Sequence, residues 1–116
     1  MDSIREEILD HYRNPRNQGM VKGATHKADK INASCGDKVS FSLLVDDGGV
    51  IKEIGWMGEG CSISMASASM LSEQMLGKKL EEIKMWGEKE MSDLVGEVNP
   101  GRSKCVMLSL SAVKEL

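Results

Sequence analysis

The chain has 116 residues, a formal net charge of −3, 41% hydrophobic residues and 28% charged residues. This length and balance predict a single folded domain over residues 1–116 and exclude a disordered chain of low hydrophobicity. The small negative charge argues against a nucleic-acid partner, because affinity for phosphate backbones depends on dense positive charge.

The first part of the chain predicts one helix followed by a polar segment. Hydrophobic residues recur at helical spacing from Ser3 to Arg13, and Pro15 ends the helix because the residue before a proline disfavours the helical region. We expect His11, on this helix, to be a capping or packing residue. Residues 16–30 show no clear period, so we expect them to cross the surface before the sheet begins, with His26 as a surface loop residue.

Two strands joined by a tight turn are predicted next. Hydrophobic residues alternate with other residues between Val39 and Val45, and a second apolar run extends from Val50 to Met57. Between them, Asp46-Asp47-Gly48-Gly49 offers turn chemistry. These features predict a β-hairpin within an antiparallel sheet of about three strands.

The rest of the chain predicts helices. Residues 62–76 follow a helical pattern that ends at Gly77, and shorter helices are expected within residues 80–95. Ser103 is a good N-cap for a last helix, which places Cys105 in its first turn. The sequence therefore predicts an α+β fold, with a small antiparallel sheet packed by helices on one side.

The chain has three cysteines, Cys35, Cys61 and Cys105. An odd number at wide spacings does not fit the disulfide framework of a secreted protein. The N-terminal residues lack the pattern of a targeting segment, and no apolar run approaches the length of a membrane span. We therefore expect a cytoplasmic protein without a membrane partner, whose cysteines serve metal binding or thiol chemistry.

Each cysteine is predicted to lie at the end of an element. Cys61 and Cys105 open helices, where the helix dipole stabilises a thiolate, and Cys35-Gly36-Asp37 precedes the first strand of the hairpin. Three thiolates and the Asp37 carboxylate suit a four-coordinate zinc site or part of an iron–sulfur ligand set. From spacing alone, two alternatives stay open: cysteines packed in the core, and Asp37 as an ordinary turn residue.

Three motifs resemble those of the IscU/NifU-type iron–sulfur assembly proteins. They are Asp10-His11-Tyr12-Arg13-Asn14-Pro15-Arg16-Asn17, Cys35-Gly36-Asp37, and the run from Gly58 to Ser69 around Cys61, followed by Cys105 on the last helix. The resemblance implies a SufE/NifU-like fold and carries ligand roles onto Cys35, Asp37, Cys61 and Cys105. It also implies a pyridoxal-phosphate-dependent cysteine desulfurase as sulfur donor and apo iron–sulfur proteins as targets.

Two departures separate the chain from housekeeping IscU-type scaffolds. Lys104 stands where those scaffolds have a histidine, and residues 98–103 replace their Leu-Pro-Pro-Val-Lys motif, so the sequence does not support a dedicated Hsp70-type chaperone as partner. The serine-rich run after Cys61 instead resembles the SufU branch, whose members bind zinc and relay sulfur. The interval between Cys61 and Cys105 is nevertheless too short for the insertion that SufU proteins carry before the last helix.

Three functions are compatible with these observations. The first is a scaffold on which a transient 2Fe-2S cluster is assembled and passed to apo-proteins. The second is a zinc-dependent sulfurtransferase that accepts sulfur from the desulfurase, and the third is a structural zinc domain without transfer chemistry. The first two both predict a role in iron–sulfur cluster assembly, with Cys35, Cys61 and Cys105 as the reactive thiols.

Overall fold

The computed structural model describes residues 3–32, 36–96 and 103–116, except for the side chains of residues 3–5. Its elements are, in chain order, α1 (Ser3–Arg13), β1 (His26–Asn32), β2 (Asp37–Val45), β3 (Ile51–Glu59), α2 (Ser62–Met75), α3 (Leu80–Lys84), α4 (Glu88–Val95) and α5 (Ser103–Val113). Across these three ranges, no helix combines the length and apolar character that crossing a membrane requires.

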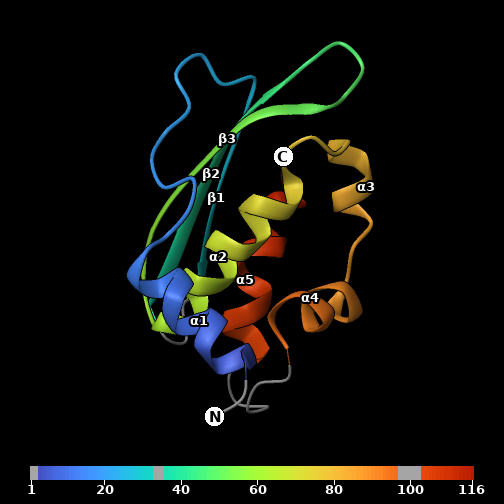
Figure 1. The fold of residues 1–116 in the computed structure, drawn as a ribbon. Coiled ribbons are helices and arrows are strands. Elements are labelled where there is room, and N and C mark those ends of the chain that lie inside the picture. Colours follow the sequence, from blue (N-terminus) through green and yellow to red (C-terminus); the bar gives the residue numbers. More distant parts are fainter. Residues whose placement is uncertain (1–2, 33–35, 97–102) are drawn as a thin grey trace.

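The three strands form one antiparallel sheet with β2 in the middle (Figure 1). Phe41 on β2 pairs with Ala28 on β1 and with Trp56 on β3. Alternate residues of a strand face the same side of a sheet. Val39, Phe41 and Leu43 therefore point together into the core, where each is at most 1% exposed.

The helices form a layer on one side of this sheet. α2 and α5 pack directly against the strands, and α1, α3 and α4 pack around those two helices (Figure 1). Residues 17–19 pair with the edge of β3 at Trp56. The following residues cross the opposite face of the sheet, where the Val21 N–H donates to the Ser42 hydroxyl at 2.9 Å. A side chain at Gly55 would collide with the carbonyl oxygen of Gly19, so this loop lies directly on the sheet.

α2 is the central helix of the layer. Ten of its 14 residues are buried, so the helix is enclosed on nearly all sides. Most of the buried residues are serine or alanine, and their short side chains let neighbouring elements approach the helix closely. α2 consequently contacts α1, α4, α5 and β3.

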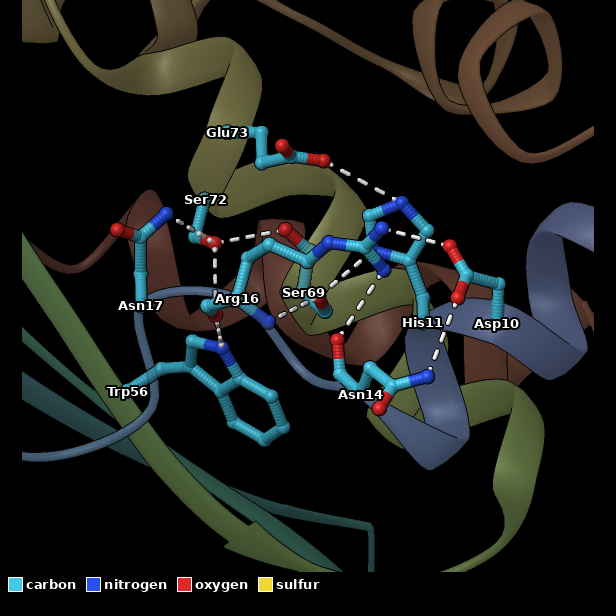
Figure 2. Close-up of polar contacts among 9 residues, drawn as sticks. All are labelled: Asp10, His11, Asn14, Arg16, Asn17, Trp56, Ser69, Ser72 and Glu73. Atoms are coloured by element: carbon cyan, nitrogen blue, oxygen red, sulfur yellow. Dashed lines mark hydrogen bonds and ion pairs between the residues drawn. The ribbon is translucent and has the colours of Figure 1, made fainter.

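A polar cluster joins the N-terminal segment to α2 and β3 (Figure 2). We call it the N-terminal clamp, and it consists of His11, Arg16, Trp56, Ser69 and Glu73. The Ser69 hydroxyl oxygen lies 2.7 Å from His11 Nδ1 and accepts the Arg16 backbone N–H at 2.9 Å. Trp56 Nε1 donates to the Arg16 carbonyl oxygen at 2.7 Å. The clamp thus ties together segments that are far apart in the sequence.

The contacts of His11 define its tautomer. Its Nε2 lies 3.3 Å from Glu73 Oε1, and an ionised carboxylate can only accept a hydrogen bond. The neutral ring therefore carries its proton on Nε2, and Nδ1 accepts the hydroxyl proton of Ser69. This buried position confirms that His11 is a packing residue.

The predicted fold class, the hairpin and the helices are confirmed, whereas the prediction for His26 was wrong. His26 opens β1, which lies largely within the segment expected to have no regular structure. The burial of β1 alternates between partly buried and exposed residues, but the sequence His-Lys-Ala-Asp-Lys-Ile-Asn is polar on both faces. Pairing with β2, rather than an apolar face, makes this segment a strand.

We predict that His11 makes stability depend on pH. Burial of the ring, and then the nearby Arg16, lower the pKa of His11 in the folded state, although Glu73, Asp10 and Glu7 oppose this effect. Between that lowered value and the ordinary value near 6.5, the unfolded chain binds more protons, so the free energy of unfolding falls as the pH falls.

Urea denaturation between pH 8 and pH 5 should show a smaller acid-induced loss of stability in His11→Gln than in the wild type. Comparison at pH 8, where His11 is neutral in both states, gives the cost of the lost contacts themselves. Equal slopes in the two proteins would show that His11 is not the responsible group.

Candidate metal centre

Three potential metal ligands from separate elements meet at one end of the sheet. Asp37 is the first residue of β2, Cys61 is the N-cap of α2, and Cys105 lies in the first turn of α5. One ligand atom from each lies within 4.8 Å of the other two. Asp37 and Cys105 are buried, whereas Cys61 is partly exposed. Three of the four predicted site residues are thus brought together.

The fourth, Cys35, lies outside the described residues. Gly36 follows it with a φ of +75°, in the left-handed region that favours glycine. This conformation lies directly before Asp37, so the chain bends where the Cys-Gly-Asp motif predicted flexibility. The alternative reading of Asp37 as a turn residue was wrong, because Asp37 pairs with Asn32 as part of the sheet.

The Asp37 carboxylate is held by the beginning of α2. Its Oδ1 accepts the backbone N–H of Cys61 at 3.2 Å, and its Oδ2 accepts the hydroxyl of Ser64 at 2.5 Å. The Cys61 thiol lies 3.5 Å from both Asp37 Oδ2 and Ser64 Oγ. The carboxylate therefore acts as a cap for the helix that carries Cys61, in addition to lying beside the thiol.

Sequence reasoning did not single out Ser64. It is three residues after the N-cap Cys61, a spacing that places both residues on the same side of the first helical turn. Ser64 is 1% exposed, and its hydroxyl faces Asp37 and Cys61 rather than solvent. The spacing Cys61-x-x-Ser64 at a predicted helix start was the available signal.

Gly60 leaves the space that Asp37 occupies. Its φ is +153°, and a Cβ built there would lie 2.5 Å from Asp37 Oδ1. Real Cβ atoms do not approach other atoms so closely, and residues other than glycine rarely adopt this backbone conformation. Glycine before Cys61 is thus required by the position of the carboxylate.

The two described thiols differ in acidity and access. Partial burial raises the pKa of Cys61, but hydrogen bonds from the side chain and backbone of Ser64, and from Cys105, outweigh burial and hold it below its ordinary value. Burial, the hydrogen bond to Cys61 and the nearby negative charges raise the pKa of Cys105 to about 11. Cys61 is therefore the more readily ionised thiol of the pair.

The donor set fits a thiophilic metal ion. Two sulfur atoms and a carboxylate oxygen are ligands that zinc and iron both accept in proteins. Ligands of a tetrahedral zinc ion with bonds of about 2.3 Å stand about 3.8 Å apart, which is compatible with the 4.8 Å limit between these ligand atoms. Asp37, Cys61 and Cys105 could hold such an ion with small side-chain movements, together with one further ligand.

The family of the chain follows from comparison with known proteins. Residues 3–115 match the family model described as the NifU-like N-terminal domain. This chain belongs to that family. The resemblance inferred from the three sequence motifs is therefore confirmed.

Two relatives align with almost the whole of this chain. The zinc-dependent sulfurtransferase SufU of Bacillus subtilis is 35% identical, with 96% of this chain and 86% of that protein covered. The iron–sulfur cluster assembly scaffold protein IscU of Haemophilus influenzae is 32% identical, with 94% and 88% covered. The SufU alignment extends over 129 residues, more than this chain contains, so SufU has residues without a counterpart here.

A solved structure shares the fold of this NifU-like domain. It is a crystal structure of a putative iron–sulfur cluster assembly scaffold protein for the SUF system from Fervidobacterium islandicum. The TM-score is 0.81 at 28% identity, with 95% of this chain and 93% of the other covered. The α+β arrangement of this chain is therefore shared with that solved structure.

We predict that Cys61 reacts faster than Cys105 with an alkylating agent in the metal-free protein. The thiolate is the reactive form, and Cys61 has both the lower pKa and the more exposed side chain. Brief treatment with iodoacetamide at pH 8, followed by peptide mass spectrometry, should show a rate ratio of about tenfold or more. Equal rates would contradict the described difference between the two thiols.

Proposed function

We propose that this protein acts in iron–sulfur cluster assembly, accepting sulfur on a metal-binding site formed by Cys35, Asp37, Cys61 and Cys105. The observation that supports this function best is the convergence of Asp37, Cys61 and Cys105 from three separate elements within 4.8 Å. Cys35 is included in the proposed site because it directly precedes Gly36 and Asp37 in the same short motif.

The proposed donor is a cysteine desulfurase, which carries sulfur as a persulfide. A cysteine thiolate of the site attacks the outer sulfur of the donor's persulfide, and the S–S bond of the donor breaks. The donor cysteine leaves as a thiolate, and the acceptor becomes the new persulfide. The exchange needs no added oxidant or reductant, because one S–S bond replaces another.

The first proposed role is a zinc-dependent sulfur relay. It is supported by the serine-rich run after Cys61 and by the likeness to the sulfurtransferase SufU. Zinc, when bound by thiolates, keeps them deprotonated and protects them from oxidation. Asp37 would be the one oxygen ligand, and the buried Cys105 would hold its sulfur away from solvent.

The second proposed role is a scaffold whose cargo is a 2Fe-2S cluster bound for apo-proteins. It is supported by the likeness to IscU scaffolds over nearly the whole chain. Thiolates bind iron–sulfur clusters strongly, whereas a carboxylate is a harder and less suitable ligand. A set with one carboxylate would hold the cargo well enough to build it and release it more easily than four thiolates.

We predict that the zinc relay and the scaffold differ in metal content and in their effect on the desulfurase. The protein should be prepared once with zinc and once anaerobically with iron and sulfide. Desulfurase turnover is measured with each preparation and with desulfurase alone as the control. Tightly held zinc with faster desulfurase turnover is expected for the relay, and a stable 2Fe-2S absorption spectrum for the scaffold. Zinc without any effect on turnover would indicate a structural zinc domain and contradict the proposed function.

We predict that Asp37→Ala has opposite effects in the two roles, weaker metal retention in a zinc relay and longer cluster retention in a scaffold. For a zinc relay, the loss of one ligand should speed zinc loss to a chelator. For a scaffold, the loss of the exchangeable oxygen should lengthen cluster lifetime in air and slow transfer to an apo-protein.

Asp47→Ala, at the exposed turn before β3, is the matched carboxylate control and should behave as the wild type. Asp37→Ala also leaves the Cys61 N–H and the Ser64 hydroxyl without this acceptor, at a cost of about 1–3 kcal/mol in stability. Thermal unfolding should therefore be measured in parallel. If both zinc retention and cluster lifetime are unchanged, Asp37 is not a ligand.

A further inference from the structure

We propose that Ser64 is a positioning residue that orients the Asp37 carboxylate as a one-oxygen metal ligand. This inference rests on the proposed metal site and deepens it, because it names the side chain that sets how Asp37 meets the metal. Ser64 itself is not proposed as a ligand. Its hydroxyl acts through Asp37.

The contacts of the carboxylate support this role. The Ser64 hydroxyl donates to Asp37 Oδ2 at 2.5 Å, and the Cys61 N–H donates more distantly to Oδ1 at 3.2 Å. Two donors on different oxygens fix the plane of the carboxylate. Oδ2 also lies 3.5 Å from the Cys61 thiol, whereas Oδ1 accepts the Cys61 N–H. Oδ2 is therefore the oxygen that faces the other potential ligands, and the Ser64 hydroxyl sets its position.

Burial makes the Ser64 contact hard to replace. Asp37 is 2% exposed and Ser64 is 1% exposed, so bulk water cannot take over the hydrogen bond. Ser64 is also fixed by its place in the first turn of α2, and its hydroxyl lies 3.5 Å from the Cys61 thiol. One rigidly held hydroxyl therefore contacts two of the proposed ligands at the same time.

Ser67, on the same helix, shows that a buried serine of α2 need not have this role. Its side chain is fully buried, and among the described residues its hydroxyl has no hydrogen-bond partner. Removal of that hydroxyl changes no described contact. Ser64 and Ser67 thus form a matched pair, alike in chemistry and burial and different in their contact with Asp37.

The consequence for the metal is a defined denticity. A carboxylate that donates through one oxygen, with the other in a hydrogen bond, is a weaker and more exchangeable ligand than a bidentate one. Partners that orient a ligand in this way contribute about 10–100-fold to metal affinity. The serine at this position therefore matters to the site although it does not touch the metal.

The test compares two pairs of proteins, the wild type with Ser64→Ala and Ser64→Thr with Ser64→Val, in each of which only the first member has the hydroxyl. Ser64→Ala removes it, and Ser64→Thr and Ser64→Val have nearly the same shape but only Thr keeps the hydroxyl. Ser67→Ala is the control. In the metal-free protein, hydrogen exchange of the Cys61 amide should be about fivefold faster in Ser64→Ala and Ser64→Val than in the wild type, because Asp37 is no longer held.

Zinc affinity is then measured by competition with a chromogenic chelator. It should fall about 10–100-fold in Ser64→Ala, fall likewise in Ser64→Val relative to Ser64→Thr, and stay unchanged in Ser67→Ala. Unchanged affinity in Ser64→Ala, or equal affinity in Ser64→Thr and Ser64→Val, would overturn the proposal. Failure of the wild type to bind zinc or iron would refute the metal site itself, and amide exchange would still report whether Ser64 holds Asp37.

Discussion

The contact between the Asp37 carboxylate and the first turn of α2 is the constraint on which the site depends. A carboxylate is very costly to bury without hydrogen-bond partners, and here the Cys61 N–H and the Ser64 hydroxyl reach it. The same contact sets the position of the Cys61 thiol and requires glycine at position 60. One link between a strand and a helix thus determines the geometry of three functional positions.

The two described thiols differ in how far the fold shields them from solvent and from a partner protein. Cys105 is held in the core by α5, whose other buried residues anchor that helix in the layer. Cys61 stands at the partly open junction of β3 and α2. Sulfur exchange needs a thiol that a partner can reach, and metal binding favours ligands shielded from water. The proposed site combines both properties because its potential ligands come from elements at different depths.

The sequence predicted most of this arrangement because its patterns are local. The alternation in β2, the turn before β3 and the serine-rich helix after Cys61 each have a short-range signal, and the family motifs united the distant cysteines. β1 was missed because its polar residues carry no alternation and its strand state comes from pairing with β2. Ser64 was missed because its importance lies in a contact with Asp37, 27 positions earlier in the chain.

The composition of α2 has a consequence for the forces that hold the helix in place. Serine and alanine lose little side-chain entropy on folding, but they also bury little apolar surface. The register of α2 therefore depends strongly on directional contacts, with Ser64 bound to Asp37 on one side and Ser69 bound to His11 on another. These two attachments are about 7.5 Å apart along the helix axis. Together they restrain the position of α2 along its axis and its rotation about that axis, and the Cys61 thiol at the start of the helix is restrained with them.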